Sequence, residues 1–240
     1  MFKEILVEER DDGIGIIILN RPSKKNALNI TMRREISECL NRWKECNEIG
    51  AVIITGSENV FSSGFDLNEF LDPTLFDDIY HSSANYHRDV WHFPKPLIAG
   101  INGLAYGGGF DLATLCDLRV CSTDAVFAHP EIKFGAPPIF TPLRWIVGEG
   151  IAKDICFTGR KIDAYKALEI GLVNDIVEND QVLNQSIEIA KQILEAPAET
   201  LRFTKEFMKQ HVAESFERAF KIEHDIAFKK VLFKQLYEKK

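Results

Sequence analysis

The sequence lacks any segment long and apolar enough to span a bilayer or to act as a secretory leader. The aliphatic run nearest the N-terminus extends only from Ile16 to Leu19, far short of the roughly 20 residues that cross a membrane. Cysteine is also scarce: the chain has five cysteines and no C-x-x-C motif, so disulfides and a cysteine zinc site are not expected. We therefore expect a cytoplasmic protein with reduced, mostly buried thiols, no membrane partner and no metal.

Basic residues are in the minority, because 29 lysines and arginines stand against 36 aspartates and glutamates, for a formal net charge of −7. Binding to a nucleic-acid backbone depends on clustered positive charge, so we expect no nucleic-acid partner. A cluster of basic residues at one chain end is usually a solvated helix face. The one such cluster comprises Lys229, Lys230, Lys234, Lys239 and Lys240.

Several familiar catalytic motifs are absent as well. The sequence has no G-x-G-x-x-G after a strand and no G-x-x-x-x-G-K-[ST], which excludes the usual dinucleotide and phosphate loops. It has no G-x-S-x-G and no H-E-x-x-H, which removes the simplest hydrolase and metalloprotease interpretations. His81, His87 and His92 do not share a helical face at this spacing, and we expect all three on the surface.

What is present is the pattern of an α/β protein. β-rich runs at 2–9 and 13–20 indicate a hairpin, and apolar residues at steps of three and four between Met32 and Cys46 predict an amphipathic helix, with Asn29 or Thr31 as its N-cap. Because strand and helix patterns then alternate, the strands are expected to be parallel. Further strands are predicted at 51–56, 96–103, 118–122 and 125–128, and helices at about 66–92 and from the glycine run to about 116.

The predicted architecture has two parts. Residues 1–185 form the α/β core, and residues 186–240 form a helical region with long segments at about 198–212 and 214–236. The apolar stripe of this region includes Phe216, Phe220 and Leu232 and needs a covering surface. A partner subunit could supply that cover.

The glycine run Gly107–Gly109 lies between a predicted strand and a predicted helix. Amides at a helix N-terminus have no internal partner and favour an anionic atom, and glycine lets a ligand approach closely. The alternative is a tight crossing that only glycine can pack. A second strand-to-helix junction, VFSSGFDL at 60–67, favours the first interpretation, because two such junctions can present two N–H donors to one oxygen, as an oxyanion hole does.

Two acidic residues accompany these junctions. Asp111 is one turn into the glycine-led helix, where the helix dipole alone would favour a carboxylate, and Glu131 follows Pro130 in AHPEIKFG, where a surface loop is the alternative. Beside an oxyanion site, the pair is suited to general acid and base chemistry on an activated carbonyl compound. His129 is either a structural hydrogen-bond partner or a substrate-orienting residue on the side of Glu131.

Four ordered motifs, FSSGFDL, INGLAYGGGFDLATLCDLRV, FAHPEIKFG and FTGRKIDAYKALEIGLVNDIV, resemble those of the crotonase family, the enoyl-CoA hydratase/isomerase superfamily. The likeness extends from about residue 5 to 215 and includes RPSKKNALN near the N-terminus. It implies a spiral of ββα repeats with a C-terminal helical trimerisation region, and a homotrimer or homohexamer. It also implies an acyl-CoA thioester substrate and no separate cofactor.

The resemblance further implies roles for particular residues. The thioester oxygen would lie between the amides of Phe65 and Gly108, with Asp111 and Glu131 as the catalytic carboxylates. The family's CoA-binding segments match Lys24, Lys25, Ala27, Ser63 and Asp66 in this sequence, and Ile139 falls near the acyl pocket, with Tyr106 and Arg144 as further lining residues. Lys229 or Lys230 would be the contacts to a neighbouring subunit's CoA.

Two departures from the family pattern leave the reaction open. Asp111 stands where hydratases carry glutamate, and GAPPIFTPLRW at 135–145 places Ile139 where glycines are common. The expected activity is hydration of a trans-2-enoyl-CoA. The alternatives are a double-bond isomerase and a non-catalytic acyl-CoA-binding protein.

Overall fold

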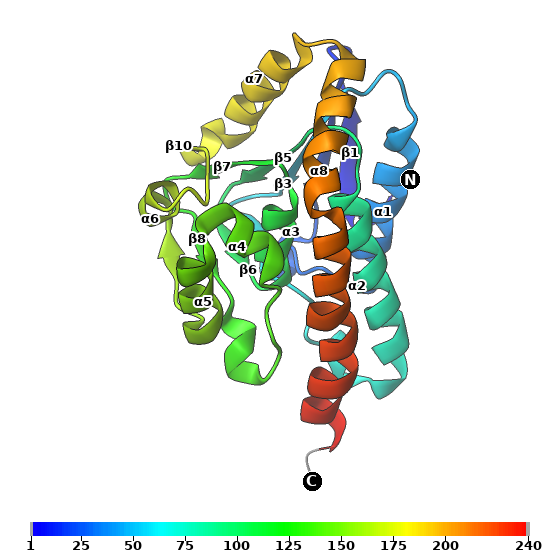
Figure 1. The fold of residues 1–240 in the computed structure, drawn as a ribbon, viewed down its shortest axis with the longest axis vertical. Helices are drawn as coiled ribbons and strands as arrows, with labels where there is room; N and C mark the ends of the chain where they lie inside the picture. Colours follow the sequence, from blue (N-terminus) through cyan, green and yellow to red (C-terminus); the bar gives the residue numbers. More distant parts are fainter. Residues whose placement is uncertain (1, 239–240) are drawn as a thin grey trace.

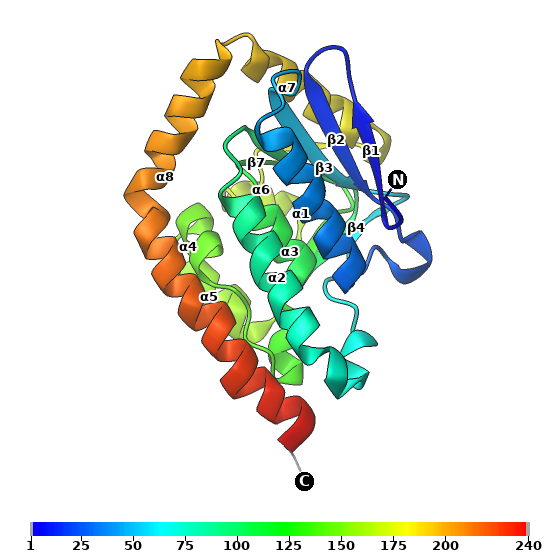
Figure 2. The same cartoon turned by 90° about the vertical axis from the view of Figure 1, so that its right-hand side faces the viewer.

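A computed structural model describes residues 2–238, without the side chains of 209–214 and 238. The chain forms two sheets covered by helices, as Figures 1 and 2 show. The larger sheet has the order β1-β2-β3-β5-β7-β10 and is parallel except for the β1–β2 hairpin. Its strands are β1 (Ile5–Glu9), β2 (Ile14–Leu19), β3 (Ala51–Gly56), β5 (Leu97–Ile101), β7 (Leu118–Ser122) and β10 (Asp175–Val177).

The smaller sheet has the order β4-β6-β8-β9, and its first three strands are parallel. Its strands are β4 (Val60–Ser62), β6 (Leu104–Tyr106), β8 (Val126–Ala128) and β9 (Ile162–Asp163). Each repeat contributes one strand to each sheet before its helical segment: β3 then β4, β5 then β6, β7 then β8. This succession is the spiral of ββα repeats that the family resemblance implies.

The helices and helical turns lie around these sheets. The α-helices are α1 (Ile30–Lys44), α2 (Phe76–Trp91), α3 (Gly108–Leu115), α4 (Thr141–Val147), α5 (Glu149–Thr158), α6 (Ala164–Glu169), α7 (Val182–Leu194) and α8 (Ala198–Phe220). Short 3-10 turns occupy Pro22–Lys24, Glu69–Leu71, Pro73–Leu75, Pro130–Phe134 and Asn179–Gln181, and π-helical turns occupy Lys221–Ile226, Phe228–Leu232 and Lys234–Glu238. Among the described residues, no helix is both long and apolar enough to cross a membrane.

The larger sheet is buried on both faces, which explains why β3 reads as a continuous apolar run. Val52 and Ile54 face the main core, whereas Ile53 faces a smaller cluster formed with Ile187 and Ala190 of α7. The expected boundary between residues 185 and 186 therefore falls inside α7, a helix that packs on the sheet. The division into a core and a C-terminal helical region stays a prediction.

Local sequence signals explain where the first helices begin. Asn29 is the N-cap of α1, and its side chain accepts a hydrogen bond from the Met32 amide at 2.8 Å. The single helix predicted over about 66–92 is wrong for its first part. Asp72 and Pro73 open a separate 3-10 turn, and α2 starts only at Phe76, because proline fits the first turn of a helix but not its interior.

The C-terminal helical region also differs from expectation. The break predicted near residue 213, between segments at about 198–212 and 214–236, is absent: α8 runs through it to Phe220, and the π-helical turns follow directly. Together they form the long outer edge in Figure 2. Phe216, Phe220 and Leu232 are buried within this same chain, and the Phe216 ring stacks on Trp91 of α2 at 4.2 Å. A partner subunit is thus not needed to cover this stripe.

The prediction that three histidines lie on the surface is wrong for His87. Its side chain is buried, and Nδ1–H donates to the Ser83 carbonyl oxygen at 2.7 Å, while the ring lies 6.2 Å from that of Phe65. His81 and His92 are exposed as expected. The spacing of the three histidines shows that they do not share one helical face, but it does not show which face of α2 is buried.

Candidate functional site

The smaller sheet brings together the segments that the sequence singled out. Phe65 follows β4, Gly107 and Gly108 follow β6, and Glu131 follows β8. Because β4, β6 and β8 are adjacent parallel strands, their carboxyl ends lie at one edge, which is where ligands bind in many parallel sheets. Residues up to 66 positions apart in sequence, Phe65 to Glu131, therefore follow strands that end at the same edge of the sheet.

Phe65 and Gly108 are in direct contact. A methyl group added to Gly108 would lie 2.6 Å from Phe65 Cδ1, and one added to Gly64 would lie 3.2 Å from the Gly108 amide nitrogen. Gly64 and Gly107 also have φ angles of +93° and +49°, which favour glycine. The glycines therefore permit both a backbone turn and a close approach between the two junctions.

The amides of Phe65 and Gly108 have no hydrogen-bond acceptor within residues 2–238. The bridge between Leu28 and Phe65 uses the Gly64 carbonyl and the Asp66 amide instead, at 2.8 and 3.5 Å. Gly108 is the first residue of α3, where amides lack a partner inside the helix. Two free N–H donors thus flank the contact between the junctions.

Asp111 lies in the first turn of α3 and is buried, with 6% of its surface exposed. Burial raises the pKa of Asp111 from 3.8 to about 8; the charge of His129 opposes this shift, while those of Glu131 and Glu223 add to it. The group is therefore protonated at neutral pH, and it can donate a hydrogen bond from its O–H.

Glu131 is held by the residue two positions before it. His129 Nδ1 lies 2.7 Å from Glu131 Oε1, and His129 Nε2 lies 3.9 Å from Asp111 Oδ1. Three buried atoms of this cluster have no hydrogen-bond partner in the described structure: Asp111 Oδ1, His129 Nε2 and Glu131 Oε2. A methyl group on Gly107 would lie 3.1 Å from Glu131 Oε2, so this free oxygen faces the glycine run.

The Asp111→Asn variant should change how stability depends on pH. The folded-state pKa is raised, so protonated Asp111 contributes stability that is lost as pH rises from about 4 to about 8. An amide does not ionise, and the variant should gain stability relative to the parent across this window, on the order of a few kcal/mol by pH 8. Urea unfolding at several pH values measures the difference. A constant difference from pH 4 to 8 would contradict the buried, neutral carboxyl.

The predicted CoA-binding segments lie side by side. The Ser63 amide donates to the Lys25 carbonyl at 3.0 Å, and the Leu28 amide donates to the Gly64 carbonyl at 2.8 Å. Lys24 and Lys25 are exposed at this edge, whereas Ala27 is buried. The Asp66 carboxylate is committed to Arg21, at 3.0 Å, so it is not a free ligand group.

Three further residues were predicted to line the site: Tyr106 at the end of β6, Ile139 after Glu131 in the chain, and Arg144 in α4. Ile139 is buried in the main core, while Tyr106 and Arg144 are half-buried. Glu223 of the C-terminal region accepts hydrogen bonds from the Thr141 amide and hydroxyl, at 3.0 and 2.5 Å. The start of α4 is thereby tied to the C-terminal helical turns of the same chain.

Two residues that the sequence did not single out contact the oxyanion candidates, Tyr86 at Gly108 and Arg33 at Phe65. The Tyr86 hydroxyl donates to the Gly108 carbonyl at 3.4 Å, and the buried Arg33 guanidinium lies 4.5 Å from the centre of the Phe65 ring. Tyr86 was detectable, because it continues the apolar spacing of Ile79 and Val90 on α2. Arg33 was not, because its burial depends on an ion pair with Glu69 at 3.3 Å.

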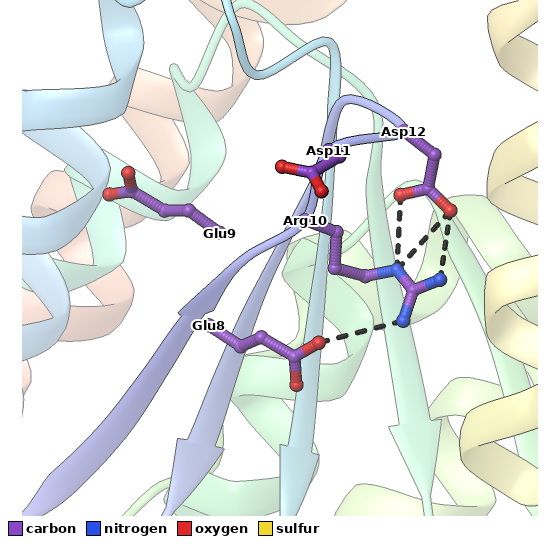
Figure 3. Close-up of a pocket in the computed structure, with 5 residues that line it drawn as sticks. All are labelled: Glu8, Glu9, Arg10, Asp11 and Asp12. Atoms are coloured by element: carbon purple, nitrogen blue, oxygen red, sulfur yellow. Dashed lines mark hydrogen bonds and ion pairs between the residues drawn. The ribbon is translucent and has the colours of Figure 1, made fainter.

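A surface hollow at the β1–β2 turn offers different chemistry. Figure 3 shows Arg10 bonded to Asp12 and Glu8, with Asp11 nearby and the Glu9 side chain pointing away from them. The lining is mostly negative, and its one cation is already paired. This hollow therefore offers no unpaired cationic side chain to an oxyanion.

The two-sheet spiral of ββα repeats, with two acceptor-free amides at one edge of its smaller sheet, defines the structural class of this α/β protein. The family model described as enoyl-CoA hydratase/isomerase matches residues 9–238. A solved enoyl-CoA hydratase/isomerase from Xanthobacter autotrophicus Py2 has a TM-score of 0.89 and 32% identity, covering 95% of this chain and 87% of that one. The chain belongs to the enoyl-CoA hydratase/isomerase family.

Named relatives are similar over most of their length. A probable enoyl-CoA hydratase, echA8, of Mycobacterium tuberculosis is 35% identical over 209 residues, which cover 86% of this chain and 81% of the relative. The short-chain-enoyl-CoA hydratase of Clostridium acetobutylicum is 31% identical over 226 residues, or 92% and 87% of the two chains.

Proposed function

We propose that the protein hydrates a trans-2-enoyl-CoA to a 3-hydroxyacyl-CoA. The observation that carries the proposal is the placement of two acceptor-free amides, at Phe65 and Gly108, beside the free oxygens of Asp111 and Glu131. Relatives named as enoyl-CoA hydratases support it. No cofactor is proposed beyond the CoA portion of the substrate.

In the proposed mechanism the two amides stabilise the negative charge of the enolate, and the two carboxyl groups hold the water and transfer its proton. The thioester oxygen accepts hydrogen bonds from Phe65 and Gly108, which stabilise the enolate as negative charge develops. Neutral Asp111 holds the water through its O–H. The Glu131 carboxylate accepts a proton from that water as its oxygen bonds to Cβ, and then returns the proton to Cα, so that H and OH are added overall.

A double-bond isomerase is the second candidate. Two observations favour it: the shorter Asp111 side chain withdraws its carboxyl group from the attacking water by about one methylene, and the buried Ile139 stands in place of small residues and reduces the room for water. In this reaction Glu131 would remove a proton from Cα of a 3-enoyl-CoA and return it to Cγ. The same amide pair would stabilise the dienolate.

Absorbance of the conjugated enoyl thioester separates these functions. We expect the absorbance of crotonyl-CoA to fall as the double bond is hydrated. A rise with a 3-enoyl-CoA and no change with crotonyl-CoA would assign isomerisation instead. Binding of butyryl-CoA without turnover of either substrate would identify a non-catalytic acyl-CoA-binding protein.

We also propose that the chain assembles as a homotrimer or homohexamer. The first half of α8 supports this, because Phe203, Phe207 and Met208 are 53% or more exposed on one helix. Lys229 and Lys230 are the alternative contacts to a neighbour's CoA, and the Lys229 ammonium lies 4.5 Å from the centre of the Tyr80 ring. Sedimentation equilibrium measures the assembly, and a monomer at micromolar concentration would contradict it.

A further inference from the structure

His129 is a buried ionisable residue that the proposed mechanism does not yet use. Its side chain is fully buried, and the ring stacks on Phe110 of α3 with centroids 4.6 Å apart and planes at 25°. Pro130 follows it and restricts its backbone. The imidazole is therefore fixed in orientation before any substrate binds.

Both nitrogens of this ring face the carboxylates of the site. Nδ1 lies 2.7 Å from Glu131 Oε1, and Nε2 lies 3.9 Å from Asp111 Oδ1 without a hydrogen-bond partner in the described residues. A carboxylate held at one oxygen has lost most of its rotational freedom. Only Glu131 Oε2 is then left to exchange a proton.

We propose that His129 is a positioning residue for Glu131: its Nδ1–H holds Oε1 and thereby aims Oε2 at the reacting carbons, while its charge acts on Asp111. The proposal rests on the proposed function. It assigns to His129 an effect on the proton-transfer step rather than on acyl-CoA binding.

The surrounding charges agree with a protonated imidazole. Burial lowers the pKa of His129, but the hydrogen bond to Glu131 and the negative charges of Glu131 and Asp111 outweigh this and raise it above 6.5. Glu223, Cys156 and Tyr86 are further ionisable groups that interact with this cluster. In return, the His129 charge lowers the pKa of Asp111 from the value that burial alone would give.

Two substitutions by amide side chains distinguish the roles of the two ring nitrogens of His129. His129→Asn places an amide group near the position of Nδ1 and can keep the bond to Glu131, whereas His129→Gln places its amide near Nε2 and loses that bond. We expect kcat of His129→Gln to fall about 10- to 100-fold with KM within a few-fold, because positioning contributes on this scale. We expect His129→Asn to keep kcat within about 5-fold.

The pH profile gives a readout that a purely structural role would not move. Neither the asparagine nor the glutamine side chain carries a charge, so residue 129 no longer lowers the pKa of Asp111. In both variants the alkaline limb of the pH profile of kcat should therefore move up by about one pH unit or more. His81→Gln removes an exposed imidazole and should leave the profile unchanged. A kcat of His129→Gln equal to that of the parent, or a limb that does not move, would overturn the proposal.

Failure of this proposal can be distinguished from failure of the proposed function. In the unliganded protein, ¹⁵N NMR of labelled histidine should show His129 titrating above pH 6.5, and Glu131→Gln should move that titration downward. This result does not depend on turnover. An unchanged titration in Glu131→Gln would show that the two side chains do not interact, whatever reaction the protein catalyses.

Discussion

Glu131→Gln should abolish most turnover while leaving acyl-CoA binding nearly unchanged. The amide has the same size and can still accept the hydrogen bond from His129, but it cannot take up and return the substrate proton. General acid and base catalysis typically contributes about 100- to 10,000-fold, and we expect a loss of kcat within this range. The measurement is the rate of absorbance change with crotonyl-CoA, together with the Kd of butyryl-CoA.

The control for this variant is Glu178→Gln, which changes an exposed carboxylate that follows β10 on the larger sheet. It should have the parent's kcat and affinity. A Glu131→Gln protein with unchanged turnover would remove Glu131 from the mechanism. A parallel loss of butyryl-CoA binding would instead show that the substitution disturbs the site as a whole.

Replacing Gly108 by proline should remove one of the two donors to the enolate oxygen. Proline has no N–H, and it is well tolerated at the first position of a helix, which Gly108 occupies in α3. Loss of one oxyanion donor costs about 100- to 1,000-fold in kcat. We expect a loss of this size with the substrate that the parent protein turns over.

The matched control is Gly108→Ala, which keeps the amide. A side-chain carbon added at residue 108 would lie only 2.6 Å from the Phe65 ring. Both substitutions are therefore compared in a Phe65→Ala background, which removes the ring and keeps the backbone amide of residue 65. The alanine double variant should retain most activity of that background. Equal activity of the alanine and proline double variants would mean that the Gly108 N–H does not stabilise the transition state.

Much of the fold follows from local pattern. The six residues of β3 and the glycine-led start of α3 were predicted from the sequence and are found in the structure, and the N-cap of α1 is Asn29, one of the two residues that the sequence offered. These features depend on side chains within a few positions of one another. Asp72 and Pro73 carried an equally local signal that divides the region before α2, and the long helix predicted there is wrong because that signal was not weighed.

The errors that remain concern contacts between distant segments. His87 was expected on the surface, and the stripe with Phe216 and Phe220 was expected to need a partner, because neither pattern reveals that α2 and the C-terminal region cover each other. Ser83 and His224, 141 positions apart, join them through a hydrogen bond of 2.7 Å. No periodicity within either helix encodes that pairing.

The sequence by itself determined the order of strands and helices, the glycines that expose two amides, and the residues Asp111 and Glu131 near them. The tertiary structure decided that β4, β6 and β8 end at one edge, that Asp111 is buried enough for its pKa to reach about 8, and that His129 lies between the two carboxylates. The reason is physical: backbone geometry responds to neighbouring residues, whereas burial and electrostatic coupling depend on every segment that surrounds a group in space.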